Sequence, residues 1–150
     1  MAPATSDDVS DEGFVDGYLA FLLAKASHLV SGGFHRQLKE LGVSIATWRI
    51  LAVLRDGARP VGDLADRVLL NQPTLSKTLD RLERDGLIKR SREAANRRSV
   101  TVSLEPRGRA LAAKLVPLAN AHEGEAFSAL SLAERKALVR MLQRTIATNG

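Results

Sequence analysis

The stretch Asn71–Ile88, NQPTLSKTLDRLERDGLI, predicts the helix that decides the fold. Asn71 can cap the start of a helix, and Pro73 fits its first turn. Gly86 is placed to end the helix. Three leucines step by four and three along one face, which makes that face the buried one: Leu75, Leu79 and Leu82.

Two shorter helices are expected just before this stretch. Ser44 can cap the first of them, whose core positions we expect at Ile45, Trp48, Leu51, Ala52 and Leu54. Gly57 and Pro60 close that helix. A short helix over about 61–69 then turns Leu64, Ala65 and Val68 inward. Short helices, a tight turn and a second amphipathic helix in this order indicate a helix-turn-helix.

A β-hairpin is predicted directly after the helix-turn-helix. Residues 87–91 form one short apolar and basic segment, and residues 99–104 alternate apolar and polar side chains as a half-buried strand does. The polar residues 92–98 connect them. Two strands around a basic loop make a wing.

Helices are expected on both sides of this module. Residues 13–41 carry two apolar stripes, which is more apolar surface than one small domain can bury and indicates a partner helix from a second chain. Pro106 opens another helix, in which Pro117 predicts a kink and Gly124 a break. Ser131 and Glu134 form a capping box for the last helix.

Composition narrows the function classes. The 150 residues contain 22 Lys and Arg, 17 Asp and Glu and no cysteine, for a net charge of +5. Without cysteine, the chain has no disulfide, Cys-ligated metal or thiol chemistry. It has no apolar run of the ~20 residues that span a bilayer and no secretory signal, so we expect a cytoplasmic protein without membrane contact.

The charge is unevenly distributed along the chain. Residues 1–16 carry five acidic and no basic side chains, which leaves +10 for the other 134 residues. Residues 77–98 hold eight basic and four acidic side chains. Such a basic segment on a helix and wing indicates double-stranded DNA as the partner, although a solvated helix face with a surface loop has the same composition.

Specific residues are candidates for DNA contacts. On the outward face of the helix, amide, hydroxyl and cationic side chains suit the major groove: Gln72, Thr74, Ser76, Lys77 and Arg81. Pro73 shapes the helix start, and its ring could touch a thymine methyl group. Arg97 and Arg98 at the hairpin tip suit the minor groove, with Asn96 supporting the wing.

The segment Gln72–Ile88, with Asn96–Val100 and Ser103–Gly108, resembles the MarR family of transcriptional regulators. Two positions depart from the family pattern: Asn96 stands where an Asp commonly orients a wing arginine, and Glu105 stands for a Thr. An Asn can hydrogen-bond that arginine but cannot pair with its charge.

The resemblance implies a mainly α protein with a small β-hairpin wing. Residues 43–105 would form a winged helix-turn-helix, residues 13–42 and 106–150 would be interlocked dimerisation helices, and residues 1–12 would be a disordered acidic tail. A homodimer would then read a palindrome with half-sites ~34 Å apart. The resemblance therefore implies a transcriptional regulator of the repressor type and not an enzyme.

Members of the family typically release DNA when a small aromatic or phenolic anion binds near the dimerisation helices. Side chains suited to such an effector lie on the first two helices: Ser27, His28, His35, Arg36, Trp48 and Arg49. The segment around them also resembles members that respond to aromatic acids such as hydroxynicotinate. The alternative is that Trp48, which falls on the apolar stripe, is a core residue and that His28 and His35 are satisfied helix residues or dimer contacts. Three histidines are too few to favour a metal site, and no cofactor is expected.

Three other functions compete with this interpretation of the sequence. The sequence has no metalloprotease, Walker, nucleophile-elbow or dinucleotide-binding motif, which disfavours an enzyme. An effector-independent architectural DNA-binding protein would share every DNA-binding feature. A protein–protein adaptor would use the winged helix only as a scaffold.

Overall fold

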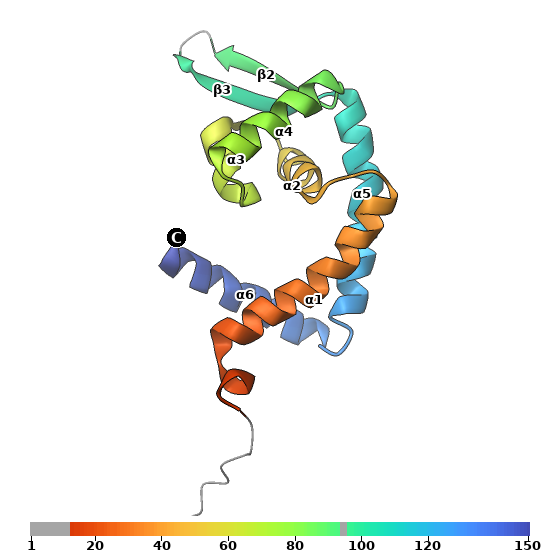
Figure 1. The fold of residues 1–150 in the computed structure, drawn as a ribbon, viewed down its shortest axis with the longest axis vertical. Coiled ribbons are helices and arrows are strands. Elements are labelled where there is room, and N and C mark those ends of the chain that lie inside the picture. The colour runs from red at the N-terminus through yellow and green to blue at the C-terminus, as the bar shows by residue number, and fades with distance from the viewer. Residues whose placement is uncertain (1–12, 94–95) are drawn as a thin grey trace, which may run out of the picture.

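The computed structural model describes residues 13–93 and 96–150, without the side chains of residues 93–98. The predicted acidic tail, 1–12, lies outside this part of the chain. The described chain is mostly helical with one small sheet (Figure 1), which confirms the predicted fold class. Its elements in chain order are η1 (Phe14–Gly17), α1 (Leu19–Glu40), α2 (Ile45–Leu54), β1 (Arg59–Pro60), α3 (Val61–Val68), α4 (Gln72–Arg84), β2 (Ile88–Glu93), β3 (Asn96–Leu104), α5 (Pro106–Ala126) and α6 (Leu132–Asn149).

The predicted helix caps of the helix-turn-helix are present. The Thr47 backbone N–H donates to Ser44 Oγ at 3.1 Å, and the Thr74 N–H donates to Asn71 Oδ1 at 2.9 Å. Gly86 follows α4 with φ +73°, a left-handed conformation that glycine adopts without steric cost. These local signals therefore fix where α2 and α4 begin and where α4 ends.

The wing has one strand more than expected. β2 pairs antiparallel with β3, with Ile88 opposite Leu104, and β1 pairs with the other edge of β3. Pro60 was expected only to close the preceding helix together with Gly57. A two-residue strand is too short to show an alternating pattern, and its Pro60 is tolerated because β1 is an edge strand.

The hydrophobic core lies within the winged lobe, which comprises residues 43–105, and within the adjoining parts of α1 and α5. Leu75, Leu79 and Leu82 of α4 are buried as predicted, and so are the three inward residues of α3. In α2, Leu51 and Leu54 are buried, but Trp48 is only half-buried at the edge of this core.

The start of α5 is closely packed against the segment that connects α4 to β2. A Cβ atom on Gly108 would collide with the carbonyl oxygen of Leu87, and the Glu105 N–H donates to that same oxygen at 2.9 Å. Arg107 Nη1 donates to the Asp85 carbonyl at 2.9 Å, which caps the C-terminus of α4. α5 then continues as one helix past Pro117 to Ala126, so the break expected at Gly124 is wrong.

The N- and C-terminal helices form an arm that leaves the winged lobe. In Figure 1, α5 runs away from the lobe, and α6 turns back from its far end and crosses behind α1 in this view. η1 and α6 bury no residue within this chain, and α1 buries only Phe34 and Leu38. Leu19 on α1 remains 82% exposed and Ile146 on α6 68% exposed. The apolar faces of the arm are therefore uncovered in the single chain.

The last helix begins as predicted. The Glu134 N–H donates to Ser131 Oγ at 3.1 Å, and the Ser131 N–H donates to Glu134 Oε2 at 2.6 Å, which together form a capping box. Across the described residues, the structure contains no helix of the length and apolarity needed to cross a membrane.

Candidate nucleic-acid interface and ligand site

The polar face of α4 is open to solvent. Gln72, Thr74, Ser76 and Lys77 are all exposed, while the leucines on the opposite face are buried. Pro73 occupies the first turn, where its missing N–H has no helical partner to lose. Four of the predicted major-groove side chains therefore lie together on one exposed surface.

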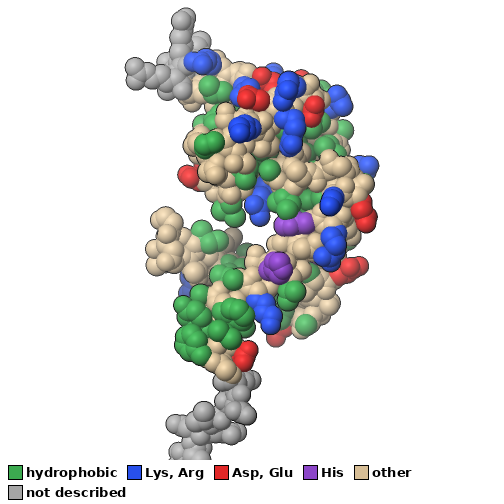
Figure 2. All heavy atoms as spheres, viewed as in Figure 1, with side chains coloured by type: hydrophobic (Ala, Val, Ile, Leu, Met, Phe, Trp, Pro, Cys, Tyr) green, Lys and Arg blue, Asp and Glu red, His purple; other side chains and the backbone are tan. Residues whose placement is uncertain are grey.

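This surface continues into the wing. A cavity of about 600 Å³ lies between the start of α3, the first turns of α4 and the hairpin, and its lining includes Gln72, Ser76, Arg90 and Ser99. Figure 2 shows Lys and Arg side chains, with some acidic ones among them, gathered over α4 and the hairpin. The polar face of α4 and the hairpin thus border one shared cavity, whose lining also includes Val61, Leu79 and Val100.

Arg81 is held away from the remaining α4 candidates. Its Nη2 donates to Thr47 Oγ1 at 3.1 Å and lies 3.4 Å from Ser44 Oγ, both at the start of α2. Helical periodicity placed Arg81 outward but could not show that a neighbouring helix offers it hydroxyl acceptors. Its guanidinium therefore lies at the junction of α2 and α4.

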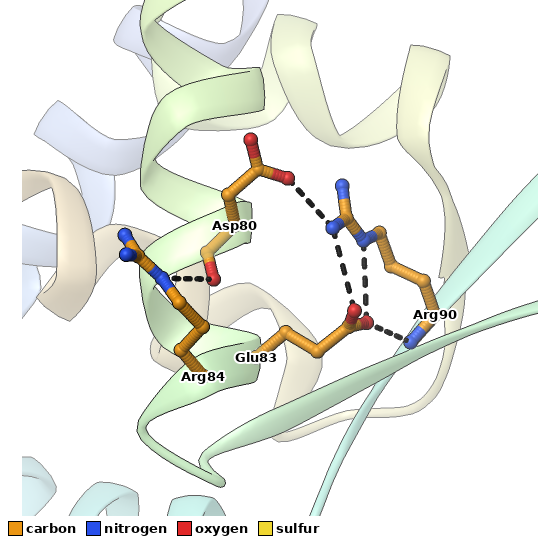
Figure 3. A network of polar contacts seen from close by, with 4 residues as sticks. All are labelled: Asp80, Glu83, Arg84 and Arg90. Carbon is orange, nitrogen blue, oxygen red and sulfur yellow. Dashed lines mark hydrogen bonds and ion pairs between the residues drawn. The ribbon is translucent and has the colours of Figure 1, made fainter.

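Arg90 of β2 forms an ion-pair network with α4 that the sequence analysis missed (Figure 3). Its Nη2 lies 2.7 Å from Asp80 Oδ1, and its Nε lies 3.2 Å from Glu83 Oε2. Hydrogen bonds from Arg90 hold the pKa of the Glu83 carboxyl below its usual value, and bonds to Glu83 and Asp80 raise the pKa of Arg90. The three-residue spacing of the two acids on α4 was the available signal.

The wing-tip candidates lie partly beyond what the structure describes. The backbone of Asn96, Arg97 and Arg98 belongs to β3, with Asn96 paired opposite Glu93. Their side chains are outside the described part of the chain. Their roles in the minor groove and in wing support therefore stay predictions.

An aromatic cluster joins α1, α2 and α5 near the candidate ligand residues. The ring of Trp48 meets Phe34 edge-on at 5.5 Å, and Phe34 stacks on His122 at 5.6 Å between ring centroids. His122 Nε2 donates to the Val30 carbonyl oxygen at 2.7 Å. Phe34 and His122 were not among the predicted ligand residues, because only the tertiary structure brings α5 beside α1.

Two of the predicted ligand residues interact electrostatically. Burial of His35 lowers the pKa of its imidazole, and the positive charge of Arg49 lowers this pKa further. The other predicted ligand residues on α1 are exposed to solvent: Ser27, His28 and Arg36. Within the described residues no hydrogen bond or ring contact joins Ser27 or His28 to Trp48. Figure 2 shows a hollow between the winged lobe and the arm, with histidine side chains beside it.

Metal binding finds no support in the described part of the chain. No group of three or more His, Cys, Asp or Glu side chains there could hold an ion.

Comparisons with known proteins agree on one family. Residues 41–99 match the sequence profile of the MarR family. A MarR family transcriptional regulator from Silicibacter pomeroyi DSS-3 has a similar structure, with a TM-score of 0.79 and 36% identity over 90% of this chain and 99% of that one.

Two further relatives have described regulatory roles. BpsR of Bordetella bronchiseptica, whose DNA binding is regulated by 6-hydroxynicotinic acid, has a TM-score of 0.75 and 31% identity over 85% of this chain and 97% of that one. The homoprotocatechuate degradative operon repressor of Escherichia coli is 31% identical over 62% of this chain and 64% of its own. The chain also spans 64% of the regulator TtmR of Methylorubrum extorquens.

Proposed function

The chain belongs to the MarR family of DNA-binding transcriptional regulators, and on this premise we propose that it is a dimeric repressor of a palindromic operator, released by a small aromatic acid. Members of this family are not enzymes. The observation that carries the proposal is the exposed polar face of α4, which borders one shared cavity with the wing.

The proposed DNA-binding unit is the winged helix-turn-helix, residues 43–105. α4 enters the major groove with Gln72, Thr74, Ser76 and Lys77 toward the bases and phosphates. Arg81, held at the start of α2, is placed for the phosphate backbone at the flank of this helix. Arg97 and Arg98 reach the minor groove from the wing tip, with Asn96 beside them.

The proposed dimerisation unit comprises residues 13–42 and 106–150. Large apolar side chains on η1, α1 and α6 are exposed in the single chain, and a second copy would bury them. A symmetric dimer places its two α4 helices in successive major grooves, ~34 Å apart, which requires a palindromic operator.

The proposed effector is a small aromatic carboxylate or phenol bound between the arm and the lobe. Trp48 offers a ring for stacking, Arg49 a guanidinium for a carboxylate, and His35 an imidazole whose lowered pKa favours the neutral form. Ser27, His28 and Arg36 line the exposed side of α1 nearby. The described roles of the Bordetella and Escherichia relatives support this ligand class.

Selection of duplexes from a randomised pool, followed by gel-shift titration, tests the DNA-binding part. We expect one enriched palindrome and two protein chains per duplex. Equal affinity for all duplexes at physiological salt would instead indicate an architectural protein without an effector.

Thermal-shift measurements with 6-hydroxynicotinic acid and related aromatic acids test the effector part. We expect stabilisation of the wild type and a weaker response from Arg49→Ala and His28→Ala. Variants that respond like the wild type would place the ligand elsewhere.

A further inference from the structure

The outer edge of the wing is attached to α4 through the main chain of Arg90. β2 is an edge strand, because β3 lies between it and β1. The backbone N–H of Arg90 on that edge donates to Glu83 Oε2 of α4 at 2.9 Å. A main-chain group that an edge strand usually leaves to water is therefore fixed to the helix.

The Arg90 side chain adds a second attachment at the same point. Its Nη2 contacts Asp80 Oδ1 at 2.7 Å and lies 3.4 Å from Glu83 Oε1, while its Nε contacts Glu83 Oε2 at 3.2 Å. Asp80 and Glu83 are three residues apart, so they lie on one face of α4. A planar guanidinium can bridge two carboxylates in this way, whereas a lysine ammonium cannot present the same fixed fork.

The network also changes the charge that α4 presents. Asp80 follows Lys77 by three residues, and its side chain is 55% exposed. A bare carboxylate there would repel DNA phosphates, and pairing with Arg90 reduces this repulsion, although Asp80, Glu83 and Arg90 together still carry a net charge of −1. Because Arg90 is paired with both carboxylates, its positive charge is not available to a DNA phosphate.

We propose that Arg90 is a positioning residue for DNA binding, which sets the wing relative to α4 so that both elements reach their grooves at once. This inference rests on the proposed DNA-binding function. Arg90 acts through the helix and the wing and does not itself contact DNA.

Removal of the two carboxylates distinguishes positioning from a direct phosphate contact. If Arg90 contacted a phosphate, the double variant Asp80→Asn/Glu83→Gln would lose two negative charges near DNA and bind more tightly. If Arg90 positions the wing, the same variant binds the selected operator more weakly, by roughly tenfold for the two lobes together. Asp85→Asn is the control, since it removes a nearby carboxylate that forms no ion pair among the described residues.

Substitution of Arg90 itself gives a second measurement. Arg90→Ala should weaken binding to the selected duplex more than to a random duplex. Loss of a direct phosphate contact would instead weaken binding to both duplexes by about the same factor. Lys89→Ala, which removes the adjacent exposed cation of β2, is the matched control.

Footprinting of the dimer completes the test, with hydroxyl radicals reporting the sugars along the minor groove and dimethyl sulfate reporting guanine N7 in the major groove. We expect the carboxylate variant, whose folding is checked by circular dichroism, to lose protection in the minor groove and keep it in the major groove. If the wild type binds its operator specifically and the carboxylate variant has the same footprint and affinity, the positioning role of Arg90 is overturned and the proposed function is not. A wild type that selects no sequence would overturn the proposed function.

Discussion

The imidazole of His122 on α5 lies so close to Gly33 on α1 that a Cβ atom at position 33 would be 2.7 Å from its Cε1. The ring cannot easily move aside, because it donates to the Val30 carbonyl and stacks on Phe34. This contact fixes the crossing of the two long helices of the arm. The glycine pair at 32–33 lies inside α1, at the point where His122 of α5 approaches.

Gly33→Ala should therefore destabilise the protein. The added methyl group overpacks the crossing, and we expect a loss of about 1–3 kcal/mol in the free energy of unfolding, measured by chemical denaturation at fixed protein concentration. Gly32→Ala is the control, because the nearest atom to its Cβ is Arg36 Nη1 at 3.7 Å. It should be neutral or stabilising by up to ~1 kcal/mol. Equal effects at both positions would contradict the role of the His122 contact.

Lys77→Ala should weaken DNA binding and reduce its salt dependence. Lys77 is exposed on the polar face of α4, and loss of one phosphate contact lowers the salt slope by ~0.9 per chain, or about two per dimer. Gel-shift titrations of the selected palindrome at several salt concentrations measure both quantities. Lys114→Ala, on the exposed side of α5, should change neither. An unchanged slope for Lys77→Ala would leave the adaptor interpretation in place.

Ile146→Asp should dissociate the dimer. This side chain is 68% exposed on α6, and we expect a buried carboxylate in the proposed interface to shift sedimentation velocity profiles toward monomer. Leu69→Asn provides the comparison, since Leu69 is 76% exposed at the end of α3 and its left-handed φ of 58° suits Asn. If both variants sediment as the wild type does, α6 is not part of the interface.

His35 should make stability depend on pH. Its pKa in the folded state lies below the ordinary histidine value of 6.5, so the unfolded chain takes up the proton more readily. The free energy of unfolding should fall as the pH drops below this value toward the folded-state pKa. Arg49→Gln removes the smaller of the two causes, and NMR titration should place the His35 midpoint nearer its unperturbed position. A midpoint above the unperturbed value in the wild type would contradict the burial of this ring.

The ends of the elements could be predicted because the signals are local. Ser44 and Asn71 satisfy N–H groups within three residues of themselves, and the apolar periodicity of α4 fixes which face is buried. The two-residue strand β1 could not be predicted, because it exists only by pairing with Val102 and Thr101, more than forty residues away.

For the candidate site, the sequence determined which side chains line the polar face of α4. Because a helix rotates 100° per residue, the sequence placed four polar side chains on the outward face of α4: Gln72, Thr74, Ser76 and Lys77. Only the tertiary structure decided that Arg81 is held by Thr47, that Arg90 is occupied by Asp80 and Glu83, and that His122 packs on Gly33 and Phe34. The physical reason is that a long charged or aromatic side chain finds its partner on whichever element packs beside it, and periodicity along one helix contains no information about that neighbour.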